Sequence, residues 1–465
     1  MPAFSPEKIA AATGGWWTRP PGETMSGFTQ DTRQLSPGQV FVAIRTDRRD
    51  GHDFLAQARE RGAAAAIVSR ENPAVPLPQL VVPNPLTAFQ AIAREHRREF
   101  PGSVIGISGS AGKTSTKDLL ALLLGGAPAV LATEGNLNNQ IGVPLTLTRL
   151  EPAQHQFAVV EAGISAPGEM APLARMIAPD VALITLVAPA HLDALGTVDG
   201  VAREKALLPA AVRPGGIALF PQACAEFSAF AGLNVRRLVI EPAGVARRSA
   251  PPPDRVYYAI TQRVDETSIA LAYGPPPPLH FTLRRVSQGI AQDVVLALTA
   301  ALWLGVNPEV IQQRLGAWQP VPWRGEQRRI GGATCYCDFY NASPASMADA
   351  LDAFMGMAPA HQPRLYVLGC MEELGAGSAD YHRQLGRSLH LRPGDFLFLL
   401  GDQAAAVRSG AIASGHAAAQ IAIIADLQPV RARLAGFTGT VFMKGSRRYH
   451  LETALEPSAS DPVHA

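Results

Sequence analysis

The segment Gly109-Ser110-Ala111-Gly112-Lys113-Thr114 follows a short apolar run at residues 104–107 and precedes a helical pattern at residues 114–124. A strand, a glycine turn, Lys-Thr and a helix in this order are typical of a site for a nucleoside triphosphate. Glycines let backbone N–H groups approach the phosphates, and the helix N-terminus adds partial positive charge. Lys113 can reach the terminal phosphates, and the Thr114 hydroxyl can bind Mg²⁺. Because Ile107 stands where the common pattern has its first glycine, this segment alone leaves a plain strand-to-helix turn open as the alternative.

Composition indicates a large, well-packed protein. The 465 residues predict about three domains, and 47% hydrophobic against 17% charged residues predicts a core throughout. The net charge is +2 and no basic-aromatic array is visible, so we expect no nucleic-acid partner. The longest apolar stretch, at 119–132, is broken by two glycines and a proline, and the first ten residues lack an apolar signal-peptide core. We therefore expect a cytoplasmic monomer that does not span a membrane.

Alternating apolar and helical segments predict three α/β domains. Residues 1–98 mix short strands and helices, with strands expected at 40–44 and 64–68. In residues 99–317, continuous apolar runs alternate with helical segments, which predicts a central doubly wound sheet. A second alternation over 318–465 predicts a Rossmann-like C-terminal domain.

Three polar residues follow the phosphate-loop segment at places where an open α/β sheet binds ligands. Glu161 ends the apolar run at 157–160, His191 lies just past the next run, and Lys205 follows on a helical pattern. Taken singly, they also fit a helix-capping acid, a loop histidine and a solvated lysine. Together, at successive strand ends, they favour a metal-phosphate site.

Several longer motifs resemble those of the Mur ligase family, over nearly the whole chain. The resemblance is strongest to the member that joins D-alanyl-D-alanine to UDP-N-acetylmuramoyl-tripeptide. The matching segments are Gly109 to Lys117, Thr133-Glu134-Gly135-Asn136-Leu137-Asn138-Asn139-Gln140-Ile141-Gly142-Val143-Pro144, Val160 to Gly163, Pro189 to Leu192, Cys337-Asp338-Phe339-Tyr340-Asn341-Ala342-Ser343-Pro344, Val367 to Gly375 and Lys444 to Arg447.

The resemblance implies an ATP-dependent amide ligase of peptidoglycan precursor synthesis, with a UDP-substrate domain, an ATP-binding domain and a C-terminal ligase domain. The peptide carboxylate would be phosphorylated by ATP, and the amine of D-alanyl-D-alanine would then displace the phosphate. The implied cofactors are ATP and Mg²⁺. The implied catalytic residues are Lys113, Glu161, His191 and Lys205.

The resemblance also implies binding roles. Thr114, Glu161, His191 and, once carbamylated, Lys205 would hold Mg²⁺. ATP would contact Gly109, Ser110, Ala111, Gly112, Lys113, Thr114, Ser115, Gln292, Arg324 and Asp338. The substrates would contact Thr29, Asp31, Thr32, Arg33, Asn136, Asn139, Tyr340 and Asn341.

The chain departs from the family pattern around the adenine base. Leu186 and Ala291 stand where the family has Asn and His, and Gln292 replaces an asparagine. Loss of such contacts predicts a raised KM for ATP with the phosphate chemistry kept. Two alternatives stay open: a Mur-type ligase that adds a single amino acid, and a nucleotide-binding scaffold without ligase activity.

Overall fold

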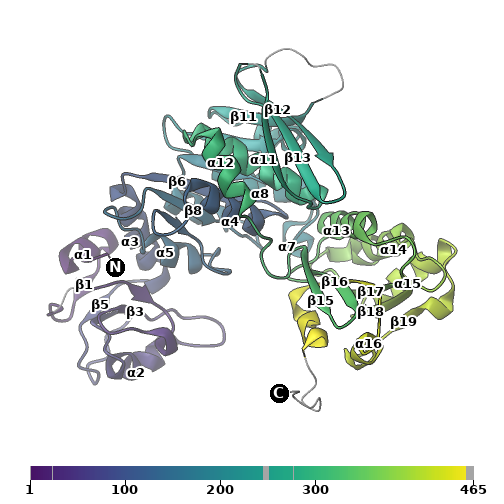
Figure 1. Ribbon diagram of the computed structural model, residues 1–465. Coiled ribbons are helices and arrows are strands. Elements are labelled where there is room, and N and C mark those ends of the chain that lie inside the picture. The colour runs from purple at the N-terminus through teal and green to yellow at the C-terminus, as the bar shows by residue number, and fades with distance from the viewer. Residues whose placement is uncertain (1, 23–24, 244–250, 276, 457–465) are drawn as a thin grey trace, which may run out of the picture.

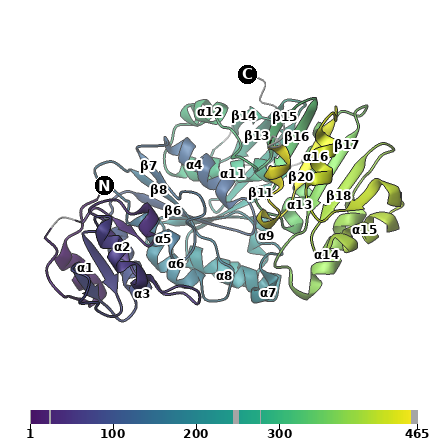
Figure 2. The ribbon, with the colours of Figure 1, turned by 90° about the horizontal axis from the view of Figure 1, so that it is seen from below.

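Three β-sheets follow one another along the chain in the computed structural model, which describes residues 2–22, 25–243, 251–275 and 277–456 (Figure 1). The N-terminal sheet and the C-terminal sheet lie on opposite sides of the largest, central sheet (Figure 2). None of the helices in the described ranges combines the length and the apolar character that crossing a bilayer requires. The predicted α/β class with three sheet-containing parts is confirmed, whereas the boundaries at 98/99 and 317/318 stay predictions.

The first sheet is small and mostly parallel. Its strand order is β1-β5-β4-β3-β2, with only β1 antiparallel to its neighbour. The elements are α1 (Pro6–Thr13), β1 (Trp16–Trp17), β2 (Phe28–Thr29), η1 (Thr32–Gln34), β3 (Val40–Val42), η2 (Gly51–Phe54), α2 (Leu55–Glu60), β4 (Ala65–Val68), β5 (Gln79–Val81) and α3 (Pro85–Glu99).

The central sheet has nine strands in the order β14-β13-β12-β11-β10-β9-β6-β8-β7. Strands β7 to β11 pair in parallel around β6, and β12, β13 and β14 form an antiparallel edge. The elements are β6 (Ser103–Ser108), α4 (Lys113–Leu124), β7 (Val130–Ala132), α5 (Gly142–Leu147), β8 (Phe157–Glu161), α6 (Met170–Ile177), β9 (Val181–Ile184), α7 (Leu192–Leu195), α8 (Val198–Ala210), β10 (Ile217–Pro221), α9 (Gln222–Ala225), α10 (Ser228–Ala231), β11 (Arg237–Pro242), β12 (Arg255–Gln262), β13 (Glu266–Ala272), β14 (Leu279–Arg284), α11 (Gln288–Trp303) and α12 (Pro308–Gly316).

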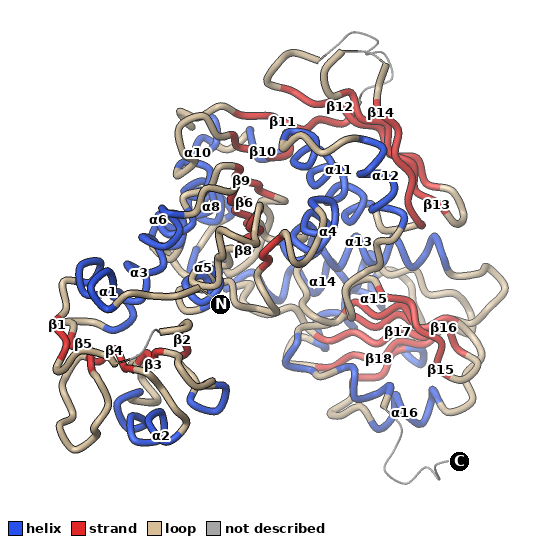
Figure 3. The backbone as a smooth tube through the Cα atoms, turned by 60° about the vertical axis from the view of Figure 1, so that its left-hand side comes forward, coloured by secondary structure: helices blue, strands red, loops and turns tan. Residues whose placement is uncertain are grey.

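Helices cover both faces of the central sheet (Figure 3). Successive side chains of β6 point to opposite faces, so Ile105 packs into one hydrophobic core with α4 and α11, and Val104 into another with α6 and α8. Because both faces are buried, the parallel strands are continuously apolar, as residues 157–160 illustrate. This is the doubly wound arrangement that the alternation of apolar and helical segments predicted.

The third sheet has the order β15-β16-β20-β17-β18-β19, parallel except for β15 against β16. Its elements are β15 (Glu326–Ile330), β16 (Ala333–Asp338), α13 (Pro344–Met357), β17 (Arg364–Gly369), η3 (Gly375–Gly377), α14 (Ser378–Ser388), β18 (Phe396–Leu400), α15 (Ala404–Ala413), η4 (Ala418–Gln420), β19 (Ile421–Ile423), α16 (Gln428–Leu434), β20 (Thr440–Lys444), η5 (Arg447–Tyr449) and η6 (Leu451–Leu455).

Candidate active site

The phosphate-loop segment turns from β6 into α4 on two glycines, Gly109 and Gly112. Gly112 has φ +78°, a left-handed conformation, and stands directly before α4. A Cβ on Gly109 would lie 1.8 Å from the Thr185 hydroxyl oxygen, and one on Gly112 would lie 2.3 Å from Asp293 Oδ1. Both positions therefore strongly favour a residue without a side chain. The loop also donates from the Ser110 N–H to the carbonyl of Leu186 at 2.8 Å.

Two lysine amino groups meet at one carbonyl of this loop. Lys113 Nζ and Lys205 Nζ donate to the Gly109 oxygen at 2.9 Å and 3.0 Å. Lys205 comes from α8 and is only 1% exposed. Burial lowers the pKa of Lys113, and burial followed by the neighbouring charge of Lys113 lowers the pKa of Lys205 well below its ordinary value. Lys205 thus lies directly beside the phosphate-loop segment.

Glu161 ends β8 beside the loop, with both carboxylate oxygens engaged. Thr114 Oγ1 donates to its Oε2 at 2.9 Å, and Asn138 Nδ2 donates to its Oε1 at 2.8 Å. The backbone N–H of Glu161 donates to Thr133 Oγ1 at 3.0 Å, which fixes the strand end. A buried carboxylate beside a hydroxyl is a donor set of hard oxygens, which suits Mg²⁺ when phosphate oxygens and water complete the shell. In the described ranges, no group of three or more His, Cys, Asp or Glu side chains could hold a metal by itself.

His191 joins the central sheet region to the C-terminal sheet region. It has φ +53° just before α7, and its Nδ1 contacts the Glu373 carboxylate. The next N–H, that of Leu192, donates to the Glu373 carbonyl at 2.8 Å. Burial lowers the pKa of His191, and the charge of Glu373 opposes that shift. Glu373 therefore orients this histidine from the other side of the interface.

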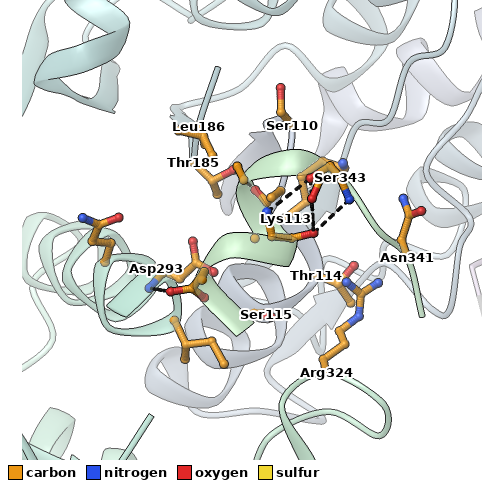
Figure 4. A pocket seen from close by; sticks show the side chains of 18 of the residues that line it. Ser110, Lys113, Thr114, Ser115, Thr185, Leu186, Asp293, Arg324, Asn341 and Ser343 are labelled. Carbon is orange, nitrogen blue, oxygen red and sulfur yellow. Dashed lines mark hydrogen bonds between the residues drawn. The ribbon is translucent and has the colours of Figure 1, made fainter. Parts of the chain in front are cut away.

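Most of the predicted site residues line a single cavity of about 910 Å³. Figure 4 shows Lys113 and Thr114 around this space with Asp293, Arg324 and Asn341. The predicted residues that line it are Ser110, Ala111, Gly112, Lys113, Thr114, Ser115, Asn136, Asn139, Glu161, His191, Gln292, Arg324, Asp338, Tyr340 and Asn341.

The remaining predicted residues lie elsewhere. Gly109 and Lys205 are not in the cavity lining, although Lys205 contacts the loop. Thr29, Thr32 and their neighbours belong to the first sheet region and do not join this cavity. There, Arg33 Nε donates to Asp31 Oδ1 at 2.9 Å, so the Asp-Thr-Arg turn is closed by its own ion pair.

The C-terminal region supplies charged and aromatic groups to the cavity. The Arg324 guanidinium lies over the Tyr340 ring at 4.1 Å from its centre. Lys444 Nζ donates to Asp338 Oδ2 at 2.6 Å and to the Asn341 carbonyl at 3.2 Å. These contacts tie the ends of β16 and β20 together at the edge that faces the phosphate loop.

Sequence reasoning missed four residues of the site. Asn138 donates to Glu161, although Asn136 and Asn139 were the residues of this motif predicted to contact substrate. The spacing of the motif does not show which asparagine has which role. Glu373 lies inside the matching segment Val367 to Gly375, but its partner is remote in sequence, and so are the partners of Asp293 and Asp349. Burial, followed by the charge of Asp349, raises the pKa of Asp293 well above its ordinary value.

Comparison with known proteins places these features in one family. The matching family descriptions are "Mur ligase family, catalytic domain" at residues 24–97, "Mur ligase middle domain" at 107–237 and "Mur ligase, glutamate ligase domain" at 323–447. The UDP-N-acetylmuramoyl-tripeptide–D-alanyl-D-alanine ligase of Escherichia coli is 31% identical over 433 residues, which are 93% of each chain. The chain belongs to the Mur ligase family. The predicted resemblance and the predicted ligase class are therefore confirmed.

Further Mur ligases extend this comparison. The ligase of the same name from Bacillus subtilis is 29% identical, with 87% of each chain covered. A crystal structure of MurF from Acinetobacter baumannii has a TM-score of 0.85 and 27% identity, with 98% of each chain covered. MurF of Thermotoga maritima, solved in complex with ADP, has a TM-score of 0.77 at 24% identity and bears on the fold alone.

Proposed function

We propose that this Mur ligase uses ATP to join D-alanyl-D-alanine to UDP-N-acetylmuramoyl-tripeptide. The observation that carries the proposal is the match over 93% of the chain to a ligase of that name, at 31% identity. The cavity supports it, because a phosphate loop, the asparagine loop at 136–139 and the Tyr340 segment face one space. An amide ligation requires the phosphate, the carboxylate and the amine to be held close together.

The proposed chemistry has two displacements. A tripeptide carboxylate oxygen attacks the γ-phosphorus of ATP, the bond to the β-phosphate oxygen breaks, and an acyl phosphate and ADP form. The amine of D-alanyl-D-alanine then attacks the acyl carbon, loses a proton and expels inorganic phosphate. Lys113 and Arg324 would neutralise phosphate charge, and Asp338 would contact the ribose. Substrates that fill the cavity between the two sheet regions would limit the access of water to the acyl phosphate.

The residues around the loop fit a divalent cation in this scheme. Thr114 and Glu161 would hold Mg²⁺, and His191 with a carbamylated Lys205 would hold a second ion. Bound Mg²⁺ would supply charge neutralisation at the phosphate oxygens. Lys205 suits carbamylation, because a buried amine with a lowered pKa is more often neutral, and the neutral amine reacts with CO₂. Glu373 contacts Nδ1 of His191, so Nε2 would be the nitrogen that binds the metal, with the carboxylate holding the ring in orientation.

The proposal is tested by product mass. The purified chain is incubated with UDP-linked tripeptide, ATP, Mg²⁺ and either D-alanyl-D-alanine or single amino acids, and ADP release is followed in parallel. We expect the dipeptide adduct and stimulation of ADP release by the dipeptide above all single amino acids. The Lys113→Ala variant should lose at least about a thousandfold in rate, because phosphate charge is left without its cation. Lys8→Ala is its control, since Lys8 is an exposed surface residue paired with Glu99.

Two outcomes would contradict this function. Equal or greater stimulation by a single amino acid would favour a ligase that adds one residue. ATP binding without any ligated product would favour a nucleotide-binding scaffold.

A further inference from the structure

We propose that this enzyme accepts several purine nucleoside triphosphates, because the base would lie beside the amide of Gln292, which can turn to present either its oxygen or its nitrogen. The inference rests on the proposed function, since it names what occupies one end of the same cavity. The base slot, as we call it, consists of Leu186, Ile240, Pro242, Tyr258, Gln292 and Leu296, all of which line the cavity.

Four residues of the slot adjoin one another along β11, β12 and α11. Pro242 in β11 lies opposite Tyr258 in β12 in the parallel register of these strands. Gln292 Nε2 reaches the Tyr258 hydroxyl at 3.5 Å, and Leu296 follows Gln292 by one turn of α11. Apolar side chains with an aromatic ring and one amide form a surface on which a flat heterocycle can stack.

The slot lies at the nucleoside end of the phosphate loop. Asp293, next to Gln292, approaches Gly112 so closely that a Cβ there would lie 2.3 Å away. In the sheet order, β8 lies on the opposite side of β6 from β11 and β12. At the end of β8, Glu161 accepts from Thr114, where the metal-bound phosphates would lie. A triphosphate stretched along the loop therefore places its terminal phosphate toward β8 and its base toward β11, β12 and α11.

The chemistry of the slot does not distinguish purines by their polar edge. Adenine presents an N–H donor beside a ring-nitrogen acceptor, whereas hypoxanthine and guanine present a carbonyl acceptor beside a ring N–H. A carboxamide pairs with either edge, because a half-turn of its end exchanges oxygen and nitrogen. Gln292 is exposed to the cavity, so this half-turn is sterically open. The Tyr258 hydroxyl both donates and accepts, and it can follow either orientation.

The test is a nucleotide panel with the full chain. Ligated product is measured by mass with the tripeptide substrate, D-alanyl-D-alanine, Mg²⁺ and ATP, ITP or GTP in turn. We expect kcat/KM values for the three nucleotides within about tenfold of one another. Product with ATP alone, at a preference above about a thousandfold, would overturn the inference and leave the proposed function standing. Product with none of the three would contradict the proposed function instead.

Two substitutions address Gln292 itself. Gln292→Leu should raise KM for all three nucleotides by a similar factor, with kcat nearly kept, since binding of the base and not the reacting phosphate is weakened. Gln292→Glu presents acceptors only, so the ratio of GTP to ATP use should rise about tenfold, because guanine offers two adjacent donors. Gln313→Leu is the matched control, an exposed glutamine on α12 outside the cavity lining. Unchanged KM in Gln292→Leu, or an unchanged GTP-to-ATP ratio in Gln292→Glu, would overturn the role of this residue.

Discussion

At the scale of single residues, Glu161 has the most exacting position, since each carboxylate oxygen already accepts one side-chain hydrogen bond. Glu161→Gln keeps the shape but removes the negative charge that a divalent cation requires. We expect kcat to fall about 100-fold to 1,000-fold and the Mg²⁺ requirement to rise, measured by steady-state kinetics across a Mg²⁺ titration. Glu134→Gln, at a side chain that is 70% exposed and paired with Arg149, should behave as the wild type. Wild-type rates for Glu161→Gln at equal Mg²⁺ would contradict the proposed metal site.

Asp293 makes stability depend on pH. Its pKa is raised by burial and by Asp349, so the folded chain holds this proton to higher pH than the unfolded chain does. The neutral form is the stable one: stability is fullest below the unfolded pKa of about 3.9 and falls as pH rises through the folded pKa. Asp293→Asn imitates the neutral form, so thermal melts should show a higher midpoint than the wild type at pH 8 and an equal one at pH 4. If the two proteins differ by the same melting midpoint at every pH, the ionisation of Asp293 does not contribute to the pH dependence of stability.

At the scale of elements, the turn from β6 into α4 depends on Gly112. Its φ of +78° and its approach to Asp293 both oppose a side chain. Gly112→Ala should raise the KM for ATP at least about tenfold, because the strain of about 1 to 2 kcal/mol displaces the N–H groups that face the phosphates. Titration calorimetry with ATP measures this loss. Gly316→Ala, at the end of α12 with no heavy atom within 4 Å of a new Cβ, should leave ATP affinity unchanged.

Elements with a clear apolar period could be predicted from the sequence. The expected strands at 40–44 and 64–68 correspond to β3 and β4, and the expected helix at 114–124 to α4. The exposed, charged strand β15, Glu-Gln-Arg-Arg-Ile, carries no such period and was not predicted.

The contact between the central and C-terminal sheet regions at His191 had no signal in the sequence either. His191 and Glu373 meet across 182 residues of chain, and no local pattern encodes that contact. The phosphate loop could be recognised because its glycines, lysine and threonine are adjacent in sequence. Glu373, which orients His191, comes from another sheet region and could not be.

At the scale of the whole molecule, Asp349 links two sheet regions. From α13 its Oδ1 accepts the Gly289 N–H in the first turn of α11 at 2.7 Å, beside the base slot. Asp349→Ala should raise the KM for ATP about threefold to tenfold, the size of one lost hydrogen bond, and should increase the radius of gyration in X-ray scattering. Asp349→Asn keeps an accepting oxygen and should restore both values. Asp352→Ala, exposed on the same helix, is the control. An Asp349→Ala variant with unchanged scattering and KM would show that this contact does not hold the regions together.

The Gly109 carbonyl, which accepts hydrogen bonds from Lys113 and Lys205, affects how the loop binds a triphosphate. Lys113 donates to the chain's own backbone there, and Lys205, from α8, donates to the same oxygen. A triphosphate that binds Lys113 therefore replaces this backbone hydrogen bond with a charge-assisted one to a phosphate oxygen.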